Sequence, residues 1–600
     1  MITKVSQAVR RHLACFIFGP ALKMVEAIFD LLIPLFMKTI IDLSFHTQTS
    51  VITQGIGNFL KLFGTWIPDN ANLNYAIIGG VCILVMGILG FATTMVTQYL
   101  AAKTAVAVGT DVRDSLYQKI LSLSQKDLEI YSLSRLLTVL NADSYQVQQG
   151  VLFFIRLAVR APFIILGSLI ISFLLDWQIG LVFLALTPLL ILIIIFIMTR
   201  ASRKYLAIQS QLDGLSNQAS DDLDGSKVVR AFNRTDYENQ RFEKASKEYQ
   251  DASIDVGKLN SLINPLTFAL VSLATLAVVL LGGLSMNATS AVQPSTIITE
   301  VAYLDQIFQT TVLLTNLILI FTKSAVSIHR VNDVLAIQPS VKECRKPQRI
   351  TLAPGDEILR FDHVDARYAK EGNLALTDID FRLAKGQSLG IIGGTGSGKS
   401  TVIKLMERFL DPVDGKVWYK GVDLKDYSLK GLREEIGYVP QKSVLFKGTI
   451  RSNMLLANPK LTDSEIHHML AMAMAEDFVS ALPSGLDNPV EESGKNFSGG
   501  QRQRLCIARA LGKSPEVLIL DDSTSALDLL TDKAVRDNLS RDYPGLTKVI
   551  VSQRIATISH CDLILVLEGG KILAQGKHDE LLNSCPAYKE TFESQTQREA

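Results

Sequence analysis

Several features that would direct a 600-residue chain towards particular functions are missing from this sequence. Its 60 Lys and Arg balance 59 Asp and Glu, so the net charge of +1 offers no basic surface for nucleic acid. The six cysteines form no CxxC pair and no cluster, which excludes a zinc or disulfide framework and predicts reduced, buried thiols. No short apolar core followed by a small-residue cleavage site opens the chain, so we expect no removable signal peptide.

Long apolar runs are abundant, but almost all of them lie before about residue 325, and the remaining residues have a soluble composition. Six of the runs can cross about 30 Å of hydrocarbon at about 1.5 Å per residue. They lie near residues 17–43, 76–101, 152–176, 178–199, 260–284 and 300–322. Charges interrupt the first and the sixth, so hydropathy supports these two spans least. Only Asp176-Trp177-Gln178 separates the third from the fourth, which predicts a tight hairpin.

The placement of Lys and Arg predicts the orientation in the membrane. The loops at 103–150 and 200–258 hold five and ten Lys or Arg, whereas the loop at 285–299 holds none. Cytosolic loops carry the excess of positive charge, so we expect both long loops and both termini in the cytosol. The membrane that the spans cross is expected to be the plasma membrane. The two long loops also alternate apolar and polar residues at helical spacing, which predicts helices that continue out of the membrane.

The most specific motif lies in the soluble part. Residues 393–400 read Gly-Gly-Thr-Gly-Ser-Gly-Lys-Ser, which fits the phosphate-binding pattern G-x-x-x-x-G-K-[ST]. Residues 388–392 predict a buried strand before this loop, and a helix is expected from Lys399. In that setting backbone N–H groups and the helix N-terminus bind phosphates, Lys399 reaches the β- and γ-phosphates of ATP, and Ser400 can bind Mg²⁺.

Downstream, Ser498-Gly499-Gly500-Gln501 precedes an apolar strand, 517–520, that ends in Asp521. With the phosphate loop, this order resembles the ATP-binding cassette (ABC) superfamily, and the resemblance extends over essentially the whole chain. It implies a multidomain fold: an all-α six-helix transmembrane domain followed by an α/β P-loop ATP-binding cassette. We assign 1–16 to an N-terminal segment, 17–325 to the transmembrane domain, 326–350 to a linker and 351–600 to the cassette. Residues 212–232 resemble the second intracellular loop of ABC exporters, which carries a short coupling helix.

The same resemblance implies roles for single residues. Tyr368 would stack on adenine, although a half-buried strand tyrosine would also explain it. Gln441 would contact Mg²⁺ and the attacking water, Asp521 would hold Mg²⁺ through its water shell, and Asp528 would lie in the loop that crosses the cassette dimer. The expected nucleotide-binding set is Tyr368, Gly393, Gly394, Thr395, Gly396, Ser397, Gly398, Lys399, Ser400, Thr401, Ser498, Gly499, Gly500, Gln501 and Asp528.

Two positions depart from the family pattern. Asp522 stands where a catalytic Glu is usual, and Gln553 stands where a switch His is usual. Removing one methylene withdraws a carboxylate by about 1–1.5 Å, and a misplacement of about 1 Å can cost about 10²-fold in rate. A neutral amide cannot carry the charge or the basicity of imidazole. With Gln441, these residues form the expected catalytic set, and we expect slow hydrolysis at this site.

Each ATP site of the superfamily combines the Walker motifs of one subunit with the signature of the other. The chain carries one membrane block and one cassette, so it is expected to be a half-transporter that needs a second half. The altered site with an intact signature resembles the degenerate subunit of heterodimeric bacterial multidrug exporters. A homodimeric lipid or peptide transporter and a nucleotide sensor that gates without pumping are the alternatives. The apolar first half excludes a soluble ABC ATPase acting on DNA.

The sequence leaves the transported compound open. Glu26, Asp30 and Asp305 lie in predicted spans, where carboxylates usually face a cavity or a partner rather than lipid. They could attract cationic amphiphiles in a cavity suited to hydrophobic drugs or lipids. Alternatively, Lys23, Arg156 or Arg160 pairs with the acidic residues of the first span.

Overall fold

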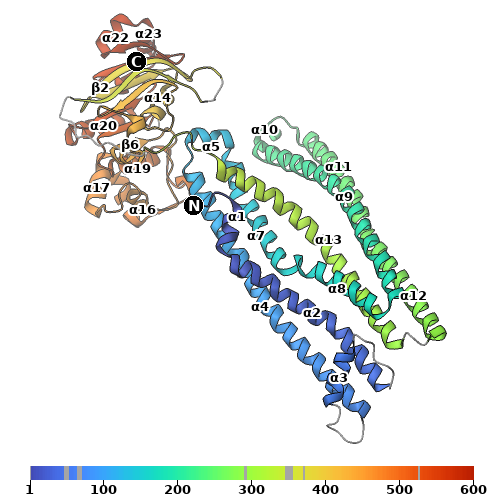
Figure 1. The fold of residues 1–600 in the computed structure, drawn as a ribbon. Coiled ribbons are helices and arrows are strands. Elements are labelled where there is room, and N and C mark those ends of the chain that lie inside the picture. The colour runs from blue at the N-terminus through green and yellow to red at the C-terminus, as the bar shows by residue number, and fades with distance from the viewer. Residues whose placement is uncertain are drawn as a thin grey trace. The chain divides into compact units, whose positions relative to one another are not determined.

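The computed structural model describes residues 2–45, 53–63, 71–289, 293–344, 356–368, 372–523 and 527–599 (Figure 1). It divides the chain into two compact units. The first contains Met1–Lys119 and Ser134–Ile337, and the second contains Ile120–Leu133 and Gln338–Ala600. The short segment after residue 119 therefore groups with the C-terminal residues, although it lies in the loop that joins two long helices.

Helices alone build the described part of the first unit. Its longer helices are α2 (Leu13–Ser44), α4 (Ala71–Leu121), α8 (Arg160–Leu175), α9 (Trp177–Asp224), α11 (Thr235–Ser261), α12 (Ile263–Thr289) and α13 (Pro294–Ala336). Short helices α1 (Val5–Arg11), α3 (Gln54–Phe63), α6 (Leu133–Thr138), α7 (Ser144–Phe153) and α10 (Ser226–Ala231) complete it. Two π-helical turns, Val139–Asp143 and Phe154–Ala158, flank α7 and join it to α6 and α8.

Four helical stretches among the described residues are long and apolar enough to cross a membrane by length and composition. They are Leu73–Leu121, Leu133–Leu175, Trp177–Ala201 and Thr235–Met286. Helices α2 and α13, which contain the first and sixth predicted spans, are not among them, so the count of six spans remains a prediction. The tight hairpin is confirmed: Asp176 separates α8 from α9, and its carboxylate accepts hydrogen bonds from the N–H groups of Gln178 and Ile179.

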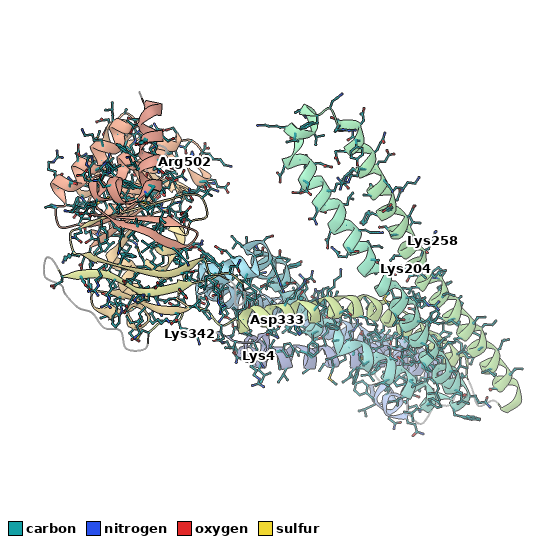
Figure 2. The ribbon with its side chains drawn as sticks, turned by 90° about the horizontal axis from the view of Figure 1, so that it is seen from above. Lys4, Lys204, Lys258, Asp333, Lys342 and Arg502 are labelled. Atoms are coloured by element: carbon teal, nitrogen blue, oxygen red, sulfur yellow. The ribbon has the colours of Figure 1, made fainter. Side chains whose placement is uncertain are left out.

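Helix α9 continues well beyond its apolar part and runs beside α11, as the periodicity of residues 203–249 predicts (Figure 1). Asp255 of α11 links the two helices through Lys204 at 3.7 Å and also binds Lys258 at 3.2 Å (Figure 2). Between them, α10 is a six-residue helix with no buried residue. Leu223, Val228 and Phe232 around α10 expose 59–76% of their surface.

The charged side chains on α2 lie in ion pairs, and three of them, Lys23, Lys38 and Asp42, are buried. Lys38 and Asp42 lie 2.6 Å apart and are almost inaccessible to solvent. Glu26 pairs with Lys23, and Arg160 of α8 lies 2.8 Å from Asp30 and 3.9 Å from Glu26. The predicted pairing of Glu26 with basic neighbours is therefore confirmed for Lys23 and Arg160. A buried charge is tolerated when it is paired, so these ion pairs reconcile acidic residues with an otherwise apolar helix.

The second unit contains two main sheets. An antiparallel sheet has the order β2-β1-β4-β5, formed by Leu376–Ala384, Glu357–Ala366, Asp414–Tyr419 and Val422–Asp423. The other sheet has the order β12-β11-β3-β10-β9-β6, and all neighbours except β12 and β11 pair in parallel. Its strands are Lys571–Gly576, Leu563–Glu568, Ser388–Gly393, Thr547–Val551, Val517–Asp521 and Ile436–Val439. The inner strands β3, β9 and β10 are almost wholly buried, which explains their continuous apolar sequences.

Helices surround these sheets. They are α14 (Lys399–Met406), α15 (Leu429–Glu435), α16 (Ile450–Leu455), α17 (Asp463–Met472), α18 (Glu476–Ser480), α19 (Gly499–Leu511), α20 (Leu529–Asp542), α21 (Ile555–Ile558), α22 (His578–Ser584) and α23 (Pro586–Glu599). Helix α5 (Gln125–Tyr131) comes from the loop after α4 but belongs to this unit. The carboxylate of Asp127 binds it there, because it accepts from the N–H groups of both Ser124 and Ser340 at 3.0 Å.

Candidate functional site

Four adjacent parallel strands end at one edge of the large sheet, and each end carries a predicted functional residue. The phosphate loop follows β3, Gln553 follows β10, Asp521 ends β9, and Gln441 follows β6. Val551 pairs with Ile391 on one side and with Asp521 on the other, so the ends are in register. Ligands of open α/β sheets bind outside the carboxyl ends of the strands. Residues far apart in sequence therefore meet where a ligand is expected.

The phosphate loop has the predicted strand–loop–helix structure. Strand β3 ends at Gly393 and helix α14 begins at Lys399, with Gly398 as its N-cap at φ +102°. A side chain at Gly398 would be strained at this φ and would also collide with Leu376. A side chain at Gly393 would collide with the carbonyl oxygen of Leu567. Gly394, Thr395, Gly396 and Ser400 are exposed, so this part of the loop is open to a ligand.

Lys399 folds over the loop from the first turn of α14. Its ammonium donates to the carbonyl oxygens of Gly393 at 2.7 Å and Gly394 at 2.8 Å. Burial lowers the pKa of Lys399, and the nearby carboxylates of Asp521 and Asp522 act in the opposite direction. An additional anionic ligand at this loop would favour the charged ammonium further. The buried hydroxyl of Ser397, by contrast, has no hydrogen-bond partner among the described residues.

Asp521 lies at the end of β9 and is 5% exposed. The hydroxyl of Tyr438 donates to its carboxylate at 3.4 Å. Burial raises the pKa of Asp521, and the neighbouring charge of Asp522 raises it further. A divalent cation would favour the ionised form, because a bound cation inverts the local balance of charge. The carboxylate of Asp521 and the exposed hydroxyl of Ser400 are hard oxygen ligands of the kind that Mg²⁺ prefers.

Asp522 leaves the strand in a left-handed backbone conformation with φ +46°. Aspartate is one of the few residues that adopt this conformation readily. Its N–H donates to the carbonyl oxygen of Val551 at 3.0 Å, which fixes the turn between the ends of β9 and β10. The side-chain amide of Gln441 donates to the Asp522 carboxylate at 3.3 Å. The structure therefore brings two members of the predicted catalytic set into contact.

Gln553, the third member, is exposed one residue after Ser552 at the end of β10. Its backbone carbonyl accepts from the side-chain amide of Gln595 in α23 at 2.7 Å. The register of β9 and β10 places Gln553 at the same edge of the sheet as Asp522 and Gln441.

Tyr368 follows β1 and is half-buried beside α14. Its hydroxyl lies 3.0 Å from the hydroxyl of Thr401, and the ammonium of Lys404 lies 4.8 Å from the centre of its ring. Lys404 also forms an ion pair with Glu129 of α5 at 3.4 Å. Neither Lys404 nor Glu129 is among the site residues predicted from the sequence. A basic residue one turn into the helix after a phosphate loop could have indicated the first, but nothing in the sequence signals the second.

The Ser498-Gly499-Gly500-Gln501 segment opens helix α19, as predicted. Ser498 is its N-cap: its hydroxyl accepts from the N–H of Gln501 at 3.3 Å, and the Gln501 side chain accepts from the N–H of Ser498 at 2.9 Å. This reciprocal capping holds the N-terminus of a thirteen-residue helix, a natural site for an anion. Both bonds join Ser498 to Gln501, and neither involves the phosphate loop of the same chain.

Asp528 is the N-cap of α20, where its carboxylate accepts from the N–H of Thr531 at 3.0 Å. The predicted dimer-crossing loop is residues 525–528, and its residues 525 and 526 lie outside the described residues. Asp528 thus has a structural role in its own chain that the sequence pattern alone did not indicate.

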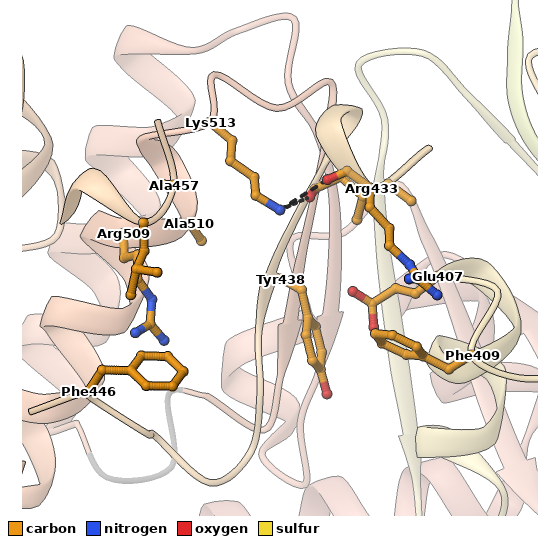
Figure 3. A pocket seen from close by; sticks show the side chains of 11 residues that line it. Glu407, Phe409, Arg433, Tyr438, Phe446, Ala457, Arg509, Ala510 and Lys513 are labelled. Atoms are coloured by element: carbon orange, nitrogen blue, oxygen red, sulfur yellow. Dashed lines mark hydrogen bonds between the residues drawn. The ribbon is translucent and has the colours of Figure 1, made fainter. Parts of the chain in front are cut away.

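A further hollow of about 300 Å³ lies between α14–α15 and α19 (Figure 3). Glu407, Arg433, Tyr438, Arg509 and Lys513 supply its polar lining. Glu407 is 6% exposed, and burial raises its pKa to about 8, although the charges of Arg433 and Lys513 act against this. Lys513 donates to the carbonyl oxygens of Arg433 and Ile436 at 3.0 and 3.4 Å (Figure 3). Tyr438 lines this hollow and also contacts Asp521, so it joins the hollow to the strand edge.

The described residues fit ATP and Mg²⁺. The phosphate loop has glycines where side chains would collide, a buried serine hydroxyl that no described residue binds, and a lysine directed at its carbonyls. When bound, Mg²⁺ neutralises charge on the transferred phosphoryl group. This chain's residues would bind the phosphates, hold the metal through Asp521 and Ser400, and place Asp522 and Gln441 on the side where water attacks.

The fold and the site together define a membrane-bound protein with an ATP-binding cassette. Two known protein families match this chain: residues 16–312 match the ABC transporter transmembrane region, and residues 376–525 match the ABC transporter domain. The chain is 34% identical over 433 residues to the "Probable multidrug resistance ABC transporter ATP-binding/permease protein YheI" of Bacillus subtilis, covering 71% of this chain and 72% of YheI. It is 30% identical over 560 residues to ATP-dependent lipid A-core flippase 1 of Colwellia psychrerythraea, covering 91% and 90% of the two chains.

A solved structure of a bacterial Atm1-family ABC exporter with ATP bound has the same fold, with a TM-score of 0.77 and 21% identity. The match covers 98% of this chain and 99% of that one. The chain therefore belongs to the ABC transporter superfamily, exporter type. It is a half-transporter with one transmembrane domain and one ATP-hydrolysing cassette, a class that binds ATP with Mg²⁺ and acts in a lipid bilayer.

Proposed function

We propose that this half-transporter works in a heterodimer that exports hydrophobic or amphipathic compounds, and that its own ATP site hydrolyses slowly. The observation that carries this proposal is the short carboxylate of Asp522, held by the amide of Gln441 at 3.3 Å. A general base must reach the attacking water, and a carboxylate one methylene shorter is withdrawn by about 1–1.5 Å. The exposed amide of Gln553 supplies neither the charge nor the basicity of a switch histidine.

The signature of this chain serves the other ATP site of the dimer. Ser498 and the N-terminus of α19 are held by reciprocal capping, and neither of these bonds involves the chain's own phosphate loop. A γ-phosphate held by the partner's cassette would receive the N–H groups of α19 and the Ser498 hydroxyl. The two ATP sites of one complex are consequently unequal: the site at Lys399 retains nucleotide, and the site at Ser498 hydrolyses it.

Six helices cross the plasma membrane in this proposal, with the cassette, both termini and the long loops in the cytosol. The six are the four stretches that are apolar enough by composition, together with helices α2 and α13. The charges of α2 are compensated by Lys23, Lys38 and Arg160, which lowers the cost of placing this helix in the bilayer. The many Lys and Arg of 103–150 and 200–258 favour the cytosolic side for these loops.

The partner is a second half-transporter, different from this chain. Helix α10 has no buried residue, and the apolar side chains around it are exposed, so another subunit is needed to cover this surface. A homodimeric lipid flippase is the second candidate, favoured by the 30% identity to the lipid A-core flippase along most of both chains. Such a homodimer would contain two copies of the site with Asp522 and Gln553, and both would be slow.

Purification of the tagged chain from its native membrane distinguishes the two candidates. We expect an equimolar complex with a second ABC half-transporter that carries Glu and His at the equivalent positions. Nucleotide trapped during turnover should amount to one long-lived ATP per dimer. A homogeneous dimer of this chain with two equal sites would refute the heterodimer.

A further inference from the structure

The carboxylates of α2 and α13 differ in how they are neutralised. Glu26, Asp30 and Asp42 each lie beside Lys23, Arg160 or Lys38, as described above. Glu300 of α13 is fully buried, and both of its carboxylate oxygens lack a hydrogen-bond partner among the described residues. A solute cannot reach that side chain without displacing its surroundings.

Asp305 of α13 is exposed instead. The amide of Gln309, one turn further along, donates to its carboxylate at 2.7 Å. Among the ion pairs of the described residues, none involves Asp305. A neutral amide satisfies part of its hydrogen-bonding capacity but leaves its negative charge uncompensated. Asp305 is therefore accessible, and no cation of the described residues pairs with it.

The position of Asp305 along its helix makes exposure to lipid unfavourable. It lies five residues after residue 300, where the sixth predicted span begins, which corresponds to about 8 Å at about 1.5 Å per residue. This is about a quarter of a hydrocarbon layer of about 30 Å, so Asp305 lies inside the predicted span. An ionised carboxylate at that depth normally faces a water-filled cavity or a partner. The buried residues Tyr303 and Ile307, two positions before and after Asp305, lie on the opposite face of the helix, so the exposed face is the one available to such a cavity.

An apolar groove of about 630 Å³ lies between α12 and α13, and Gln309, the hydrogen-bond donor to Asp305, is one of the residues that line it. Phe268 and Phe308 line it with their rings edge to face at 6.2 Å, and Pro265, Val312 and Leu313 extend its apolar wall. Gln309 belongs to the same lining and links the groove to the carboxylate. Volumes of about 300–1,000 Å³ are typical of sites for small organic ligands.

We propose that this groove binds lipophilic cations, with Asp305 neutralising the charge and the two phenylalanines contacting the apolar body. The inference rests on the proposed function, because it places this face of α13 on a cavity of the assembled exporter. An uncompensated carboxylate beside an apolar wall is complementary to a bulky organic cation and repels an anion of the same shape. Aromatic faces add attraction for a cation that has left water. The substrate class is therefore organic cations with an apolar body, rather than neutral or anionic lipids.

Equilibrium binding tests this without ATP, using the purified native complex in lipid nanodiscs. The probes are tetraphenylphosphonium and tetraphenylborate, which share one shape but carry opposite charges. Asp305→Asn should weaken tetraphenylphosphonium binding about tenfold, as expected for the loss of one partly solvated charge pair. It should leave tetraphenylborate binding unchanged or stronger, and Asp305→Glu should retain cation binding. Phe268→Ala should weaken both probes, because it removes apolar contact rather than charge.

Asp333→Asn is the matched control. Asp333 lies on the same helix, 28 residues beyond Asp305, where it is exposed and paired only with His329 in the described structure (Figure 2). This variant should bind both probes as the wild type does. Unchanged cation binding in Asp305→Asn, equal loss of both probes, or no cation binding by a wild-type complex that hydrolyses ATP would each overturn the proposal. Failure of the heterodimer would appear in subunit composition and trapped nucleotide, which this binding assay does not measure.

Discussion

Repairing the altered catalytic positions should accelerate hydrolysis at this chain's own site. The double variant Asp522→Glu with Gln553→His restores both the reach of the carboxylate and an imidazole at the end of β10. In the structure Asp522 is anchored by its N–H to Val551, so its carboxylate cannot advance by a backbone shift without losing that bond. The added methylene of Glu is therefore the direct way to gain the missing reach.

The expected gain follows from the geometry. A general base contributes about 10²–10⁴-fold, and moving a reacting group by about 1 Å changes rates by about 10²-fold. We expect the double variant to raise single-site turnover by at least about tenfold and by up to about 10²-fold. The left-handed φ of +46° suits Asp better than Glu, so the repair should also cost stability, on the order of 1 kcal/mol at most.

Single-site turnover is measured in a complex whose partner lacks its own catalytic carboxylate. Phosphate release and the lifetime of trapped nucleotide then report on the site at Lys399 alone. Asp522→Asn in the same background is the matched control, because it keeps the length of the side chain and removes its basicity. Transport need not improve, since a long-lived nucleotide can keep the cassettes together between strokes.

Two results would refute the reasoning. The first is a double repair with the same turnover as the parent complex while nucleotide still binds. The second is a parent complex that hydrolyses ATP at this site as fast as an ordinary catalytic site does, with a turnover that Asp522→Asn leaves unchanged. Either result would mean that the short carboxylate does not limit this site.

Three further predictions concern the cassette. Lys399→Ala should weaken nucleotide binding at this chain's own site, while the ATPase activity of the complex falls less than after the matching change in the partner; equal and complete loss would indicate equivalent sites. Ser498→Arg should abolish nearly all ATPase activity without weakening binding at Lys399, and Ser498→Ala, which removes only the cap at about 1 kcal/mol, controls for helix stability; retained turnover in the arginine variant would contradict action in trans. Glu407→Gln should become increasingly stabilising as pH rises from about 5 to 9. Folding raises the pKa of the Glu407 carboxyl to about 8, so this group contributes stability at pH values below its unfolded-state pKa. The contribution is lost as pH rises through the folded-state pKa. The stability gap from thermal unfolding should grow by up to a few kcal/mol, and a gap independent of pH would contradict a buried, protonated Glu407.

Local chemistry explains which parts of the cassette were predictable. The glycine pattern at 393–398 requires a turn before a helix, and the structure places β3 and α14 on either side of it. Ser498 is a good N-cap residue and Gln501 follows it three residues later, so the start of α19 was also predictable from the sequence. Both inferences depend on residues within a few positions of one another.

Contacts between distant segments were not predictable in the same way. The pairing of Gln441 with Asp522 requires β6 and β9 to be neighbours, which sequence spacing does not specify. The grouping of residues 120–133 with the cassette depends on Asp127 reaching Ser340, more than 200 residues away. In the membrane domain, hydropathy supports α2 least, because charges interrupt its apolar run, and the partners that neutralise them include Arg160 of another helix.

Lys404 contacts both Tyr368, which is predicted to stack on adenine, and Glu129 in the loop after α4. It lies against the ring of Tyr368 and pairs with Glu129, whose side chain is 51% exposed. A nucleotide that displaces Lys404 from one contact changes its free energy in the other, and linkage requires α5 to alter nucleotide affinity by the same factor. An exposed ion pair is worth about 1 kcal/mol or less, which limits that factor to about fivefold. This contact can therefore bias the order in which nucleotide and α5 bind the cassette. The free energy that drives a transport stroke must come from larger contact surfaces.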